Sequence, residues 1–198
     1  MSPVPEQRET FIFPLHTVLF PGGILPLKIF EQRYIEMTKI CLRDNRPFGV
    51  CQIREGRETG APALPEPIGC FATITQWDMP QGLFQLIVRG GERFRIIGET
   101  RVAANGLISA QVELLPPESA AAEMDITCCE VLKVVIDKVG AANFPEPIRL
   151  DDPAWVAYRL AEILPVDAAV KQRLLELQDS AARFSLLRRI MIEQGLIN

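Results

Sequence analysis

The stretch of residues 13–34, FPLHTVLFPGGILPLKIFEQRY, constrains the fold of this 198-residue chain most strongly. It contains three prolines and the pair Gly22-Gly23, which exclude a long helix and allow a sharp reversal of the chain. The apolar residues on either side of the glycines are typical of buried strands. We therefore expect two short strands, bent at proline and glycine, with the second leading directly into a helix.

That helix is expected to run from Glu31 to about Arg43. Four side chains recur there at spacings of four, three and four residues, which places them on one helix face. They are Phe30, Tyr34, Met37 and Cys41. A carboxylate at the helix start, as at Glu31, is favoured by the helix dipole.

Further strands are predicted at residues 48–53, 68–77, 83–89, 93–103 and 107–115. Residues 78–82, DMPQG, are expected to form a turn, and Asn105-Gly106 is typical of a type I′ hairpin. The pair Gly90-Gly91 predicts a bulge or bend. Residues 54–67 are charged and rich in proline, which favours a surface loop.

The pattern changes at Pro116-Pro117, after which apolar residues recur with helical spacing. Ser119 is a candidate N-cap for a helix that ends at Gly140. The apolar stripe of this helix consists of Met124, Cys128, Val131, Leu132, Val135 and Val139. Three more helices are expected, with N-caps at Asp152, Asp167, and Asp179 or Ser180.

These patterns divide the chain into three parts. Residues 1–10 are polar and contain proline, as expected of a flexible tail. Residues 11–117 are expected to form a β-rich unit, and residues 118–198 an α-helical bundle. Hydrophobic residues make up 48% of the chain, which is enough to bury a sizeable core.

Four stretches, in order along residues 11–192, resemble the substrate-binding N-terminal domain of Lon proteases. The resemblance is closest to stand-alone proteins that carry this domain without the protease. Residues 48–56 resemble the strand and loop after the first helix, and residues 171–190 resemble the end of the domain. The opening motif and the Arg-Phe strand contribute Pro21, Gly22, Gly23, Phe30, Glu31, Tyr34, Arg93 and Phe94.

This resemblance implies an α+β fold, with a PUA-like β pseudo-barrel that contains one early helix and a C-terminal annex of four helices. Lon proteases also need an ATPase module and a Ser–Lys dyad, both further along their chains. Neither lies in the region of resemblance, so we expect this chain alone not to be an enzyme.

The sequence itself offers no catalytic motif. It lacks G-x-x-x-x-G-K-[ST], G-x-S-x-G and H-E-x-x-H. The single histidine, His16, lies in an apolar region and is expected to be structural. We therefore predict no catalytic residues and no cofactor.

Cysteine spacing and the N-terminus bear on metal binding and on location. The five cysteines include no C-x-x-C pair, which favours reduced thiols in the cytosol and argues against a zinc site. The first residues lack the pattern of a signal peptide, and no apolar stretch approaches the ~20 residues of a membrane span. A cytoplasmic protein is expected.

Two charged residues are candidates for a structural ion pair. Glu31 starts the first helix, and Arg93 follows the double glycine. We expect them to pair inside the barrel and to tie the helix to the sheet.

The expected function is that of a binding module for unfolded or tagged polypeptide in protein quality control, with Lon or another protease system as a candidate partner. Candidate polypeptide-binding residues are Trp77, Met79 and Phe84 at a strand turn, although Trp77 and Phe84 could instead close the barrel end. A free strand edge could also accept a peptide. The alternatives are a PUA-like RNA-binding protein, which the net charge of −4 disfavours, and a barrel that binds a small ligand.

Overall fold

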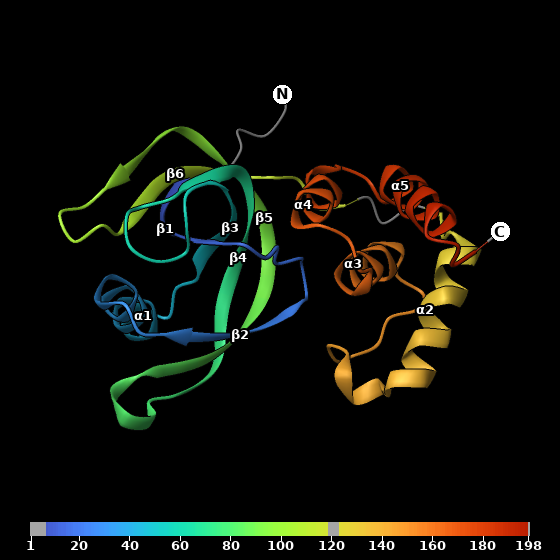
Figure 1. Ribbon diagram of the computed structural model, residues 1–198, viewed down its shortest axis with the longest axis horizontal. Helices are drawn as coiled ribbons and strands as arrows, with labels where there is room; N and C mark the ends of the chain where they lie inside the picture. The colour runs from blue at the N-terminus through green and yellow to red at the C-terminus, as the bar shows by residue number, and fades with distance from the viewer. Residues whose placement is uncertain (1–6, 119–122, 198) are drawn as a thin grey trace. The chain divides into compact units, whose positions relative to one another are not determined.

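Figure 1 shows the computed structural model of the chain, in which residues 7–118 and 123–197 are described. The chain divides into two compact units, one ending at Leu115 and the other starting at Pro116. The first unit contains β1 (Gln7–Leu15), β2 (Ile24–Ile29), α1 (Gln32–Asp44), β3 (Phe48–Glu55), β4 (Leu64–Asp78), η1 (Pro80–Gly82), β5 (Phe84–Val102) and β6 (Ile108–Leu114). The second contains α2 (Ile126–Val139), η2 (Ala141–Asn143), α3 (Pro153–Ile163), α4 (Ala168–Glu176) and α5 (Ser180–Glu193). The predicted α+β fold is confirmed.

Five strands of the first unit form a closed ring. The sheet order is β2-β5-β4-β3-β1-β6, and β6 pairs in turn with β5, which closes the ring. The β1–β3 pair is parallel, and β1 also pairs with β6 in the antiparallel direction. Among the described strands, β2 pairs with β5 alone and so lies outside the ring. The predicted pseudo-barrel is therefore present, with one strand added at its side.

β5 belongs to the ring and also pairs with the added strand β2. We call the part of the sheet formed by β2 and the adjoining parts of β5 and β4 the arm. Its first half pairs with β2, and its second half pairs with β6. The prediction of two separate strands was wrong, because β4 pairs with β5 on both sides of Gly90-Gly91 and keeps it continuous. A register shift opposite Phe71 marks the bulge that the double glycine predicted.

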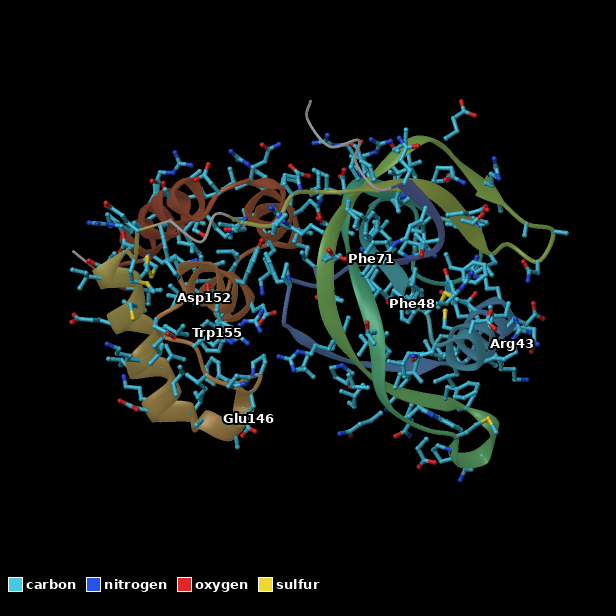
Figure 2. All side chains as sticks on the ribbon, turned by 180° about the vertical axis from the view of Figure 1, so that it is seen from behind. Arg43, Phe48, Phe71, Glu146, Asp152 and Trp155 are labelled. Carbon is cyan, nitrogen blue, oxygen red and sulfur yellow. The ribbon has the colours of Figure 1, made fainter. Side chains whose placement is uncertain are left out.

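The core of the first unit consists of two apolar clusters. One draws on all five ring strands and fills the ring around Phe71 and Phe94, whose centroids lie 4.7 Å apart. The other packs α1 against the sheet through Tyr34, Met37 and Cys41. Figure 2 labels one member of each cluster, Phe71 for the ring interior and Phe48 for the helix side. The helix face was predicted correctly for these three residues.

Phe30 departs from that predicted face, since 57% of it is exposed. It directly follows β2, ahead of the first residue of α1, so its orientation follows the alternation of a strand rather than the period of a helix.

The N-terminal residues also differ from expectation. Residues 7–10 are not a loose tail but the first part of β1, where they pair with residues 113–110 of β6. The exposed Gln7 and Glu9 alternate with the half-buried Arg8 and the buried Thr10. A polar segment can therefore be a strand when one of its faces meets water, and composition alone did not reveal this.

The hairpin between β5 and β6 was predicted correctly, but its turn type was not. Gly106 has φ +82°, and its N–H donates to the carbonyl of Ala103, while Ala103 N–H donates to Leu107. Asn105 does not share the positive φ that a type I′ turn requires. The connection is a three-residue loop with glycine in the left-handed position.

The turn of residues 20–23 packs directly on Gly90 of β5. Gly22 N–H donates to the Gly90 carbonyl and Gly90 N–H to the Gly23 carbonyl, both at 2.8 Å. A Cβ at Gly90 would lie only 2.1 Å from the Phe20 carbonyl oxygen. Glycine at position 90 therefore permits the close approach that fixes where β2 begins along β5.

In the second unit, aspartates cap three helices. Asp125 accepts from Cys128 N–H, Asp152 from Ala154 and Trp155, and Asp179 from Ala182. Figure 2 shows the labelled Asp152 and Trp155 near the start of α3. Asp167 is the N-cap residue of α4 without a side-chain bond to the backbone.

The first helix of this unit begins later than expected. Ser119, the predicted N-cap, lies outside the described residues, and α2 starts at Ile126 behind Asp125. Its buried face includes Cys128 and Leu132 as predicted, and Ile136 in place of the exposed Val139.

The Glu118 side chain forms a buried network of polar contacts in the second unit. Its carboxylate lies 2.5 Å from the guanidinium of the fully buried Arg183 and accepts hydrogen bonds from the hydroxyls of Tyr158 and Ser180. Arg183 also donates to the carbonyls of Leu174 and Leu177. This carboxylate thereby joins the segment that precedes the helices to α3 and α5.

We expect Gly90→Ala to destabilise the first unit, because the added methyl would overlap the backbone of Phe20. Overpacking of this kind costs about 1–3 kcal/mol, and the rigid backbone partner favours the upper end. Chemical denaturation monitored by intrinsic fluorescence measures this loss. Gly91→Ala is the matched control, since its Cβ would meet Phe71 at an ordinary 3.6 Å. Equal destabilisation by both changes would contradict this account.

We expect Glu118→Gln to destabilise the helical unit, because it leaves the Arg183 charge buried without its carboxylate. Breaking a buried pair from one side costs about 3–5 kcal/mol. Hydrogen exchange of the α3 and α5 amides measures the loss where it occurs. Glu193→Gln, at an exposed position of α5, serves as the control and should leave protection unchanged.

Candidate functional site

The outer edge of β2 is an open strand edge of the first unit. Gly90 N–H donates to the Gly23 carbonyl, and hydrogen-bonded pairs alternate along an antiparallel ladder. Leu25, Leu27 and Ile29 therefore direct their backbone groups to β5, and the intervening residues of β2 direct theirs away from it. No described strand pairs with that outer side.

Pro26 occupies one of these outward positions. Proline has no N–H, so it is tolerated in a strand where that group would not enter the ladder. The outward edge consequently offers an N–H and a carbonyl at Ile24 and at Lys28, but only a carbonyl at Pro26. This edge was not predicted from the sequence, although a proline inside a predicted strand is a signal that could have indicated it.

A pocket of about 260 Å³ lies beside this edge. Consecutive residues 25–31 form one wall, and the buried Tyr34 of α1 contributes to its lining. Phe13 and Leu15 supply apolar surface from β1, while Thr17 lies just beyond that strand. Glu58 and Thr59 come from the loop between β3 and β4, which the sequence predicted as a surface loop.

Glu31, at the pocket wall, is the N-cap residue of α1. Its carboxylate lies 3.0 Å from the guanidinium of Arg33 and accepts from Gly60 N–H at 3.4 Å. The predicted pair of Glu31 with Arg93 was therefore wrong, because a nearer cation in the first turn of α1 takes the carboxylate. The Arg33 guanidinium also donates a hydrogen bond to the carbonyl of Gly106, at 3.2 Å.

Tyr34 forms the buried side of this pocket. Its ring lies 4.3 Å from that of Phe13, and the guanidinium of Arg33 lies 4.6 Å from its centroid. Burial raises the pKa of the Tyr34 hydroxyl to about 12, against the opposing influence of Arg33, and the carboxylates of Glu31 and Glu58 add to the rise. The hydroxyl thus stays neutral across the physiological range.

Large apolar side chains are exposed at the end of the arm formed by β2, β4 and β5. Trp77 is 56% exposed, and Met79 and Leu83 are also exposed around the turn. Phe84 is buried beneath Trp77, with ring centroids 5.8 Å apart. Of the three predicted binding residues, two therefore face solvent, while Phe84 belongs to the core.

Phe30 lies at the same end of the arm, because it directly follows Ile29, which pairs with Phe84. We call Phe30, Trp77, Met79 and Leu83 the arm-tip residues. Figure 1 shows the β4–β5 hairpin that carries three of them, close to β2.

The remaining motif residues have structural positions. Arg93 and Phe94 are buried on β5, and the Phe94 ring occupies space that a Cβ at Gly49 or Gly69 would enter. Pro21, Gly22 and Gly23 form the turn over Gly90. The turn fixes the start of β2, Arg93 and Phe94 belong to the ring, and none of these residues lines the pocket beside β2.

The five cysteines are buried free thiols, and desolvation raises the pKa of Cys51 and Cys128 well above the usual thiol range. His16 is exposed, and its backbone N–H donates to Glu58. Residues 7–118 and 123–197 contain no group of three His, Cys, Asp or Glu that could hold a metal ion. In the same ranges, no helix has the length and apolar character needed to cross a bilayer.

Residues 9–193 match the family model described as the ATP-dependent protease La (LON) substrate-binding domain. Lon protease 2 of Myxococcus xanthus is 27% identical over 194 residues, which cover 91% of this chain and 23% of that protein. Lon protease of Escherichia coli strain K12 is 26% identical over 205 residues, which cover 96% of this chain and 26% of that protein. The chain thus spans about a quarter of the length of these relatives.

Two solved structures have the same fold. A Lon N-terminal domain protein from Xanthomonas campestris superposes with a TM-score of 0.77 at 32% identity, covering 92% of this chain and 98% of that one. The N-terminal domain of the Mycobacterium avium complex Lon protease gives a TM-score of 0.65 at 18% identity, covering 93% and 96%. Because the family match extends over residues 9–193, the chain belongs to the Lon substrate-binding domain family.

Proposed function

We propose that this chain binds unfolded or tagged polypeptide and does not itself cleave it. The observation that carries the proposal is the exposure of four large apolar side chains, the arm-tip residues Phe30, Trp77, Met79 and Leu83, at the end of the arm whose outer strand, β2, has an open edge. Exposed aromatic and methionine side chains are typical of sites that bind other polypeptides. Membership of a substrate-binding domain family supports the same function.

The two alternatives from the sequence have less support. The chain carries a net charge of −4, whereas binding to a phosphate backbone relies on clustered Lys and Arg. The pocket beside β2 holds about 260 Å³, below the roughly 300–1,000 Å³ of pockets for drug-sized ligands. Its size is better suited to a single side chain.

The bound polypeptide would be passed to a protease system, with Lon as the first candidate because the curated relatives are Lon proteases. We place this activity in the cytoplasm, where the five free thiols would remain reduced.

A permanently unfolded protein, such as fluorescently labelled, carboxymethylated α-lactalbumin, should bind the purified chain in an anisotropy titration. We expect the double change Trp77→Ser with Met79→Ser to weaken binding about tenfold or more, because exposed aromatic anchors dominate interfaces of this kind. The client should be recovered intact after incubation.

The matched control is Val134→Ser, which removes an apolar side chain of similar exposure from α2. It should bind as the unaltered chain does. Absence of binding by the unaltered chain, or equal loss in the control, would refute the proposal.

A further inference from the structure

We infer that the outer edge of β2 captures an extended segment of polypeptide as an additional antiparallel strand, with one apolar side chain of that segment in the pocket beside β2. This inference rests on the proposed function and specifies how the polypeptide is held.

The backbone of β2 determines the kind of partner. Outward N–H and carbonyl groups at Ile24 and Lys28, with a carbonyl at Pro26, repeat every second residue. Their complement is the backbone of another extended chain, which presents donors and acceptors at the same spacing. Because backbone groups are common to all sequences, this mode of capture suits unfolded polypeptide of varied sequence.

The pocket determines which side chains matter. In an added antiparallel strand, the residues opposite Ile24, Pro26 and Lys28 would place their side chains on the same solvent-exposed face as those three residues. The residues between them would place theirs on the face of Leu25 and Leu27, where the pocket lies. The residues that donate hydrogen bonds and the residue that fills the pocket are thus different members of the same segment.

Pro26 and Lys28 argue against a second copy of this chain as the occupant. Proline and lysine on an edge strand weaken its pairing with the same strand of a second copy. Proline lacks an N–H donor, and the lysines of the two copies repel each other. A foreign segment that contains neither proline nor lysine meets only the missing N–H of Pro26. Its own N–H can still donate to the Pro26 carbonyl.

The binding segment can be identified with overlapping nine-residue peptides from the α-lactalbumin client, and the tightest fluorescein-labelled peptide then serves as the probe. Single N-methyl groups are placed along it in turn. N-methylation should weaken binding about tenfold at every second residue and should have little effect at the residues between. Leu or Val replaced by Ser should matter most at one of the intervening residues.

Pro26→Ala is a test in which binding is expected to become tighter instead of weaker. It adds an outward N–H to the edge, so we expect peptide binding about two- to tenfold tighter. A merely apolar surface would bind equally or less tightly after this change, because apolar area is lost. Thr17→Trp should fill the pocket from an exposed position and weaken binding, whereas Gln111→Trp on β6 should not.

The results separate two failures. If the unaltered chain binds neither the unfolded client nor any peptide, the proposed function itself fails. If it binds both, yet N-methylation shows no alternation and Pro26→Ala does not tighten binding, polypeptide is bound without strand addition and this inference is overturned.

Discussion

The close approach of the turn at residues 20–23 to Gly90 is the contact on which the arm depends. Two backbone hydrogen bonds of 2.8 Å join the segments, and a side chain at position 90 would prevent them. This contact sets the register of β2 on β5 and directs alternate backbone groups of β2 outward. The open edge, the pocket beside it and the start of α1 all follow from where that turn sits.

Burial affects several ionisable side chains of the first unit. Its three thiols are buried, and desolvation raises the pKa of Cys41 and Cys51; its histidine is exposed, and burial raises the pKa of Tyr34 beside Glu31. Near the pocket, Arg33 is paired with Glu31, and His16 N–H donates to Glu58. In addition, the arm exposes the outward backbone groups of β2 and the apolar arm-tip side chains.

Much of the fold followed from local signals in the sequence. Proline and glycine located the first turn, the spacing of Tyr34, Met37 and Cys41 gave the buried face of α1, and Asp152 and Asp179 marked helix starts. These features depend on residues near one another in the chain. The family resemblance added the pseudo-barrel, which local patterns do not specify.

The errors concern interactions between distant segments. Residues 7–10 are a strand because β6 lies beside them, and β5 is continuous because β4 spans its glycines. Glu31 binds Arg33 rather than Arg93, which no spacing rule distinguishes. The pocket beside β2 joins residues from β1, α1 and the β3–β4 loop, so no local pattern in the sequence indicated it.

The double membership of β5 has a mechanical consequence. Tension on β2 along its own direction would load all its bonds to β5 together, in shear, and not open them one after another from an end. β5 would pass that load into a closed ring in which each of the five described strands pairs with two neighbours, so the ring has no end strand at which peeling could start. A domain built in this way can keep its own shape while a chain attached to its arm is pulled.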